Sequence, residues 1–138
     1  EHRLPSEWAV EIVSKISGSY LFYVKEFMFI SKLVEYLKKK GYKVETKSKV
    51  RNVLVDVLAE KDNKLVACEV KVGWKGRKIG TRAVRSLITY VSMLRKKYPG
   101  KNVVGWLVTN MTFTPMAEKV AEKYGIYVVD IGKLTDSS

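Results

Sequence analysis

The spacing of apolar residues changes along this chain of 138 residues, and the change restricts the folds that the chain can adopt. Before Gly41, a start signal at Ser6 and a stop at Gly18 predict a helix at about residues 6–17, and apolar side chains at helical spacing predict a second at about residues 23–40. Segments rich in β-branched residues follow, and they predict three consecutive strands at residues 42–46, 53–60 and 64–72. A turn at residues 61–63 joins the last two of these as a hairpin.

In the second half of the chain, segments with the apolar spacing of helices alternate with segments typical of strands. A helix is expected at residues 80–97, a strand at 103–109, a helix opened by Thr114-Pro115 and a strand at 126–131. The nearly all-apolar segment 103–109 is expected to lie inside a sheet. The order α, α, β, β, β, α, β, α, β predicts an α/β fold, in which helices flank a mixed central sheet.

The same spacing predicts which helix faces are buried. Three sets of apolar residues define these faces: Phe27, Ile30, Val34 and Leu37; Val84, Leu87, Ile88, Val91 and Leu94; and Ala117, Val120, Ala121 and Tyr124.

Composition excludes several classes of protein. Hydrophobic residues at 46% and charged residues at 29% exclude a disordered tail, and a single Cys excludes a disulfide scaffold. No apolar run approaches the roughly 18 to 20 residues that span a bilayer, and we expect no signal peptide. We therefore expect one globular cytoplasmic (intracellular) domain that uses neither a membrane nor a small-molecule substrate.

Positive charge is concentrated in one part of the chain. The formal charge is +12, and no acidic residue occurs between Val70 and Pro115. The basic residues of that stretch are Lys71, Lys75, Arg77, Lys78, Arg82, Arg85, Arg95, Lys96, Lys97 and Lys101. Such clustering favours a nucleic-acid partner over a merely solvated Lys-rich surface. The absence of Gln and the single Cys are typical of heat-adapted proteins.

Charged residues interrupt two of the predicted strands. Asp56 lies inside an apolar run, and a buried carboxylate loses several kcal/mol of hydration unless it finds a partner. Glu69 and Lys71 interrupt the next strand, and residues two apart on a strand share a face at roughly 6.5 to 7 Å. Hairpin pairing would bring Asp56 beside them.

Two interpretations fit this cluster. In the structural one, Lys71 neutralises the acids as a buried ion pair. In the functional one, Asp56 and Glu69 hold a hard divalent cation, and Lys71 positions or deprotonates an attacking water. Two acids meet one base, so the surplus negative charge favours the cation.

The motif resembles that of a known superfamily. Val55-Asp56 followed by Cys68-Glu69-Val70-Lys71 is similar to the core motif of the PD-(D/E)xK nucleases, whose common fold is αβββαβ. Further similarity to the Mrr-like restriction endonuclease branch lies in residues 75–80, 83–85, 113–117 and 124–126, and in Asp130. Archaeal Holliday junction resolvases and RecB-like nucleases share the core. The resemblance implies a restriction-endonuclease-like domain at residues 23–138, preceded by a helical extension at residues 1–22.

The resemblance also assigns roles to individual residues. It implies that Asp56 and Glu69 bind metal and that Lys71 is catalytic. It adds a Glu from the helix before the sheet, for which Glu26 is the best match and Glu35 the second choice. For Glu26 the alternative is an ordinary carboxylate on a helix surface. The implied cofactor is Mg²⁺, with Mn²⁺ able to substitute.

Four features depart from the family pattern. Val55 stands where the family has Pro, Glu69 stands where many Mrr-like members have Gln, and residues 47–52 replace a Gly-rich turn. Ser86 replaces the Gln of the RecB-like Gln-x-x-x-Tyr motif, which leaves Tyr90 as a candidate core residue.

The expected function is that of a Mg²⁺-dependent endodeoxyribonuclease acting in restriction, repair or recombination. The residues expected to contact nucleic acid are Lys75, Arg77, Lys78, Arg82, Arg85 and Trp74, where Trp74 either stacks on a base or packs in the core. One alternative is a homodimeric junction resolvase, and another is a non-catalytic nucleic-acid-binding module. His2 and Cys68 are weak candidates, because the first lies near a terminus and the second is expected to be buried.

Overall fold

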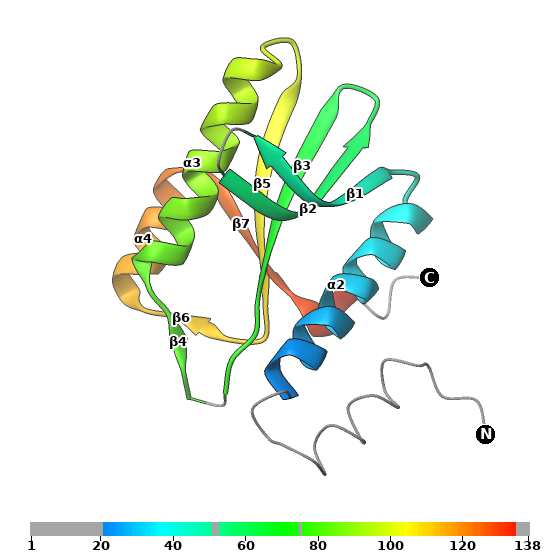
Figure 1. Ribbon diagram of the computed structural model, residues 1–138. Helices are drawn as coiled ribbons and strands as arrows, with labels where there is room; N and C mark the ends of the chain where they lie inside the picture. The colour runs from blue at the N-terminus through cyan, green and yellow to red at the C-terminus, as the bar shows by residue number, and fades with distance from the viewer. Residues whose placement is uncertain (1–20, 51–52, 75, 135–138) are drawn as a thin grey trace, which may run out of the picture.

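The computed structural model describes residues 21–50, 53–74 and 76–134 (Figure 1). Its elements in chain order are α2 (Leu21–Lys39), β1 (Lys43–Val50), β2 (Val53–Lys61), β3 (Lys64–Lys71), β4 (Lys78–Ile79), α3 (Thr81–Lys97), β5 (Asn102–Thr109), β6 (Thr112–Phe113), α4 (Pro115–Lys123), β7 (Ile126–Asp130) and the 3-10 helix η2 (Ile131–Leu134). The helix expected at residues 6–17, and all but two residues of the proposed extension, lie outside the described residues. None of the described helices is long and apolar enough to cross a membrane.

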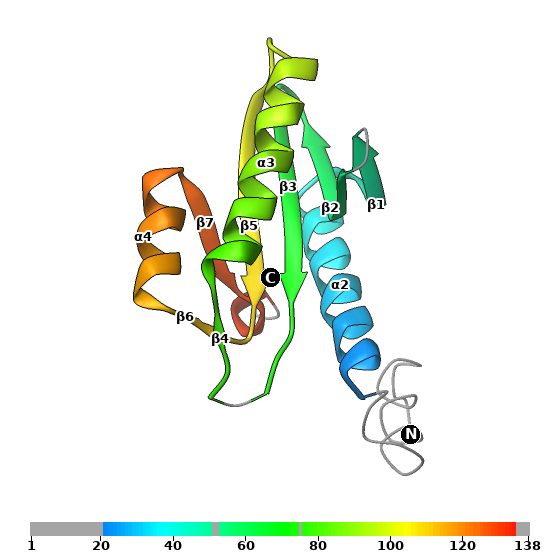
Figure 2. The ribbon, with the colours of Figure 1, turned by 60° about the vertical axis from the view of Figure 1, so that its left-hand side comes forward.

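The elements form a mixed sheet of five strands in the order β1-β2-β3-β5-β7. The pairs β1–β2 and β2–β3 are antiparallel, whereas β3–β5 and β5–β7 are parallel. Figures 1 and 2 show α2 on one face of the sheet and α3 and α4 on the other. The structure therefore confirms the predicted mixed sheet flanked by helices, with β5 inside it.

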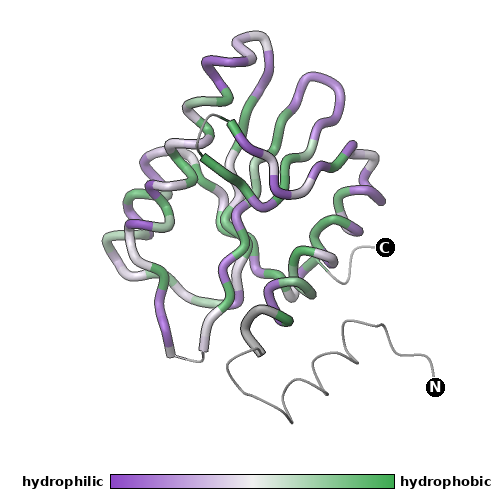
Figure 3. The backbone as a smooth tube through the Cα atoms, in the orientation of Figure 1, coloured by the Kyte–Doolittle hydropathy of each residue, from purple (hydrophilic) through white to green (hydrophobic). Residues whose placement is uncertain are grey.

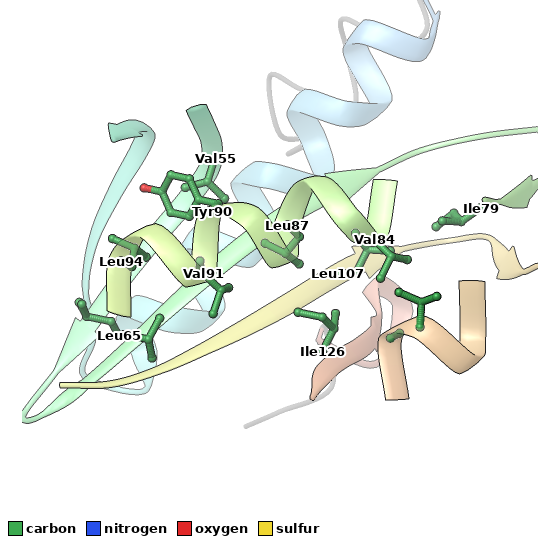
Figure 4. Close-up of a cluster of buried hydrophobic side chains, with 14 of the residues drawn as sticks. Val55, Leu65, Ile79, Val84, Leu87, Tyr90, Val91, Leu94, Leu107 and Ile126 are labelled. Atoms are coloured by element: carbon green, nitrogen blue, oxygen red, sulfur yellow. The ribbon is translucent and has the colours of Figure 1, made fainter. Parts of the chain in front are cut away.

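Each face of the sheet carries its own hydrophobic core. Under α3 and α4, Leu87 and Leu94 pack with Leu107, and Tyr90 lies against Val55 of β2 (Figure 4). Under α2 and η2, the core includes Leu33, Leu37, Val57, Val66 and Val108. Figure 3 shows these hydrophobic stretches along the central strands and hydrophilic residues at the β2–β3 turn.

Two predictions about burial are wrong. Phe27 is 56% exposed, because the face of α2 that meets the sheet is centred on Leu33 and Leu37 and Phe27 lines a surface cavity instead. Tyr124 is 47% exposed, because α4 ends at Lys123 and the next residue leaves the helical path. The remaining residues of the α4 face are buried as expected.

A small second sheet escaped prediction. Strands β4 and β6 have two residues each and pair in parallel, Lys78 with Thr112 and Ile79 with Phe113. Two residues are too few to show a strand period. This sheet ties the segment after β3 to the segment after β5.

Candidate active site

The candidate site lies where the β2–β3 hairpin opens. Ladder pairing runs from Lys61 and Lys64 at the turn to Val57 and Cys68, and it ends there. One residue further along β2, a side chain replaces the backbone pairing between the two strands. The Oδ2 atom of Asp56 accepts a hydrogen bond of 2.7 Å from the backbone N–H of Val70. Asp56 is only 9% exposed, so this bond supplies a partner that its buried carboxylate needs.

Glu69 and Lys71 lie side by side on β3, as the strand period predicts. Lys71 Nζ is 3.6 Å from Glu69 Oε2, and the Glu69 side chain is 20% exposed. Burial, followed by the charge of Asp56 and hydrogen bonding to it, raises the pKa of Glu69 to about 8, while Lys71 acts in the opposite direction. Asp56, Glu69 and Lys71 therefore meet at one spot, and the catalytic roles expected of them stay predictions.

The electrostatics of this spot suit a cation. The raised pKa means that the Glu69 carboxylate is disfavoured as an anion, first because it is desolvated and then because it lies beside Asp56, and Lys71 offsets only part of this. A divalent ion would remove that penalty, and carboxylate oxygens are the ligands that Mg²⁺, Mn²⁺ and Ca²⁺ prefer. In the described part of the chain, no three His, Cys, Asp or Glu side chains are grouped to hold a metal ion. The role of Asp56 and Glu69 as metal ligands stays a prediction.

Glu26 is the residue expected to contribute a further metal ligand or a water contact. It lies on α2 and lines a cavity of about 980 Å³ that Asp56 also lines. The full lining is Glu26, Phe27, Ile30, Ser31, Val34, Glu35, Lys38, Lys39, Thr46, Lys47 and Asp56. Glu35, the second choice, forms an ion pair of 3.5 Å with Lys39. The structure brings Glu26 into the same cavity as Asp56 but not into a three-ligand cluster, and its role as a ligand stays a prediction.

Sequence analysis missed a second break, between β1 and β2. Thr46 pairs with Val57 and Ser48 with Val55, so Lys47 stands opposite Asp56. Lys47 has a φ of 55°, which costs a non-glycine residue about 1–2 kcal/mol.

At this break, the inward-facing side chains of β2 also switch from one face of the sheet to the other. Val55 belongs to the core under α3, whereas Val57 belongs to the core under α2, although residues two apart on a regular strand share a face. A lysine carries no preference for positive φ, so the only sequence signal was the replacement of a Gly-rich turn by residues 47–52.

The basic segment after β3 is anchored at its start. The side chain of Asn110 accepts a hydrogen bond of 3.2 Å from the N–H of Gly73 and donates one of 3.3 Å to its carbonyl. Trp74 is 50% exposed, so the alternative that it packs in the core is wrong. The side chains expected to contact nucleic acid that the structure describes are all exposed: Arg77, Lys78, Arg82 and Arg85. Lys75 lies outside the described residues.

The weaker candidates have structural roles or fall outside the structure. Cys68 is fully buried, and burial raises the pKa of its thiol far above the usual range, so it is not a nucleophile. Tyr90 is 1% exposed and belongs to the core, while Ser86 is exposed. His2 lies outside the described residues.

An antiparallel hairpin that opens beside an Asp, a Glu and a Lys, within a mixed sheet flanked by helices, defines a restriction-endonuclease-like domain. The Mrr_cat family model, described as "Restriction endonuclease", matches residues 24–137. The chain therefore belongs to this restriction endonuclease family. No curated protein gives a significant match.

Several solved structures resemble the chain. A repair endonuclease from Pyrococcus abyssi has a TM-score of 0.60 and 30% identity over 77% of this chain and 45% of its own. EndoMS in a complex with double-stranded DNA has a TM-score of 0.55 and 26% identity over 71% of this chain and 42% of its own. The MspJI restriction endonuclease, bound to a 27-mer oligonucleotide, shares the fold with a TM-score of 0.53 and 14% identity over 94% of this chain and 30% of its own. The chain thus spans less than half the length of each.

Proposed function

We propose that this chain is the catalytic domain of a metal-dependent DNA endonuclease, which uses Mg²⁺ or Mn²⁺ to hydrolyse phosphodiester bonds. The observation that carries the proposal is the meeting of Asp56, Glu69 and Lys71 at the open end of the β2–β3 hairpin. Membership of the restriction endonuclease family supports it. Two structural neighbours are described as complexes with DNA or an oligonucleotide, which supports a DNA substrate.

Each residue of the cluster has a task in this proposal. Asp56 and Glu69 would hold the divalent ion, which supplies Lewis-acid polarisation of the phosphate and lowers the pKa of water. The Val70 N–H holds Asp56 against β3, so that its carboxylate stays beside Glu69. Lys71, 3.6 Å from Glu69, orients the attacking water and stabilises the charge that builds on the phosphate oxygens.

The exposed basic side chains supply the DNA contacts. Arg77 and Lys78 follow the loop that leaves β3 beside the site, and Arg82 and Arg85 continue on the first turns of α3. Cations near a cleavage site bind the phosphate backbone, so affinity for DNA should fall steeply as salt rises.

The experiment is cleavage of supercoiled plasmid and of a four-way DNA junction, with Mg²⁺, Mn²⁺ or EDTA. Wild type should cleave only with metal, and Asp56→Ala and Lys71→Ala should be inactive. Asp62→Asn is the matched control, because Asp62 is an exposed carboxylate at the β2–β3 turn. Equal activity in all four proteins would refute the catalytic assignment. Firm DNA binding without cleavage under any metal would support the non-catalytic alternative, and preferential cleavage of the junction by a dimer would support the resolvase.

A further inference from the structure

Lys47 is a cation beside the candidate site to which the family resemblance assigns no role. It stands opposite Asp56 in the β1–β2 pair and lines the same cavity between α2 and the sheet. The basic residues discussed above follow β3 and continue on α3, whereas α2 packs on the opposite face of the sheet. Lys47 therefore adds positive charge on the α2 side of Asp56.

The backbone at Lys47 shows that this position is unusual. Its φ of 55° lies in the left-handed region, which strand residues rarely enter. Gly would adopt this conformation without strain, yet the position carries a long cationic side chain. Residues held in such conformations cluster at functional sites, where they aim a side chain or open a strand pair.

The side chain of Lys47 is also available to a ligand. It is exposed and takes part in none of the ion pairs formed in the described part of the chain. The cavity wall includes two other lysines, Lys38 and Lys39, both in the last turn of α2, and Lys39 is paired with Glu35. Lys47 is the one that stands on the sheet, opposite Asp56. An ammonium on a flexible stem binds phosphate as a point charge.

We infer that Lys47 binds a backbone phosphate of the DNA strand on the α2 side of the site, and thereby positions the neighbouring phosphodiester at Asp56. This inference rests on the proposed function, since DNA is the assumed ligand. It makes Lys47 a positioning residue that acts on the path of the substrate, while the chemistry belongs to Asp56, Glu69 and Lys71.

The test measures binding of a fluorescein-labelled DNA duplex at a series of salt concentrations, without metal, for Lys47→Gly, Lys47→Arg and Lys49→Ala. Gly keeps the positive φ and removes the ammonium, and Arg keeps the charge. Lys49→Ala is the matched control, because Lys49 is an exposed lysine of the same strand outside the cavity. Thermal melting of each variant shows whether it is folded.

Lys47→Gly should bind about tenfold more weakly, and its slope of log affinity against log salt should fall by about one unit. Lys47→Arg should behave as wild type, and Lys49→Ala should keep the wild-type slope. A Lys47→Gly protein that matches Lys49→Ala in affinity and slope overturns the inference, even if wild type cleaves DNA. If wild type binds DNA but never cleaves it, the proposed function fails while the slope still decides the role of Lys47. A wild type that does not bind DNA overturns both.

Discussion

The two ends of the β2–β3 hairpin are built differently. At the turn end, backbone pairing is continuous from Lys61 and Lys64 to Val57 and Cys68, and the strands need no side chain to hold them together. At the other end, pairing stops, and the carboxylate of Asp56 receives the N–H of Val70. Pairing of β3 with β5 meanwhile continues on the far side, as far as Lys71 and Thr109.

This difference separates stability from function along a single hairpin. The regular end buries apolar side chains on both faces, whereas the open end gathers two carboxylates, an ammonium and a strained lysine. Changes at the open end should therefore affect activity, and changes at the turn end should affect only folding. The predictions below test that separation.

The largest effect is expected at Asp56. Asp56→Asn and Asp56→Ala should each lower the cleavage rate by roughly 10²–10⁴-fold, because both remove the negative charge of the carboxylate that is proposed to hold the metal ion. Only Asp56→Ala should also lose stability, by about 1–3 kcal/mol, since it leaves the buried Val70 N–H without an acceptor. Single-turnover cleavage and urea denaturation measure the two effects. Equal stability of the Asn and Ala variants would show that the hydrogen bond between the side chain at position 56 and the Val70 N–H does not stabilise the fold in place of β2–β3 backbone pairing.

Lys71 should affect the chemical step alone. Lys71→Met should reduce the cleavage rate by roughly 10²–10³-fold, since it removes the cation beside the reacting phosphate. Its affinity for DNA without metal should change little, because Lys71 lies among many other basic residues. Binding and single-turnover rates measured on the same duplex separate these quantities. A parallel loss of affinity and rate would place Lys71 among the DNA-binding residues instead.

The structure of the turn end of the β2–β3 hairpin could be predicted from the sequence, whereas that of the open end could be predicted only in part. Alternation and β-branched residues define strands such as 64–72, and a shared strand face places Glu69 beside Lys71 from the sequence alone. Burial of Phe27 was mispredicted, because periodicity gives the spacing of a helix face but not which part of the helix the sheet covers. The positive φ of Lys47 depends on the break opposite Asp56, a tertiary feature that no local preference records.

A substitution in the core at the turn end should lower stability and leave activity unchanged, in contrast to the loss of activity expected at Asp56. Val66 is fully buried, pairs with Ala59 and packs in the core under α2. Val66→Ala should cost about 1–3 kcal/mol, because it leaves a cavity in that core. Below its melting temperature the variant should cleave DNA at the wild-type rate. A large loss of activity in the folded variant would mean that the two ends are not independent.

A smaller effect is expected across the cavity, at Glu26. Glu26→Gln should slow cleavage by about tenfold if its carboxylate orients metal-bound water rather than the metal itself. Glu35→Gln is the matched control, since Glu35 lines the same cavity but is paired with Lys39. Manganese titration, followed by thermal melting, tests ligation directly. Loss of the manganese-induced stabilisation in Glu26→Gln would make Glu26 a ligand, and identical behaviour of the two variants would assign it to the helix surface.

The smallest effect is expected at Asp62, which together with Lys47 makes up the two non-glycine residues of positive φ in the described chain. Lys47 lies on β1 opposite Asp56, and Asp62 lies in the β2–β3 turn. Asp62, with a φ of 54°, lies in the β2–β3 turn, where Asp tolerates this conformation through local hydrogen bonding. Asp62→Gly should therefore change stability by no more than about 0.5 kcal/mol and leave the salt dependence of DNA binding unchanged. Lys47→Gly is the same kind of replacement at the open end, and it should change that salt dependence. If both variants bind DNA as wild type does, positive φ at Lys47 is only a feature of the hairpin's shape, and the open end owes its function to Asp56, Glu69 and Lys71 alone.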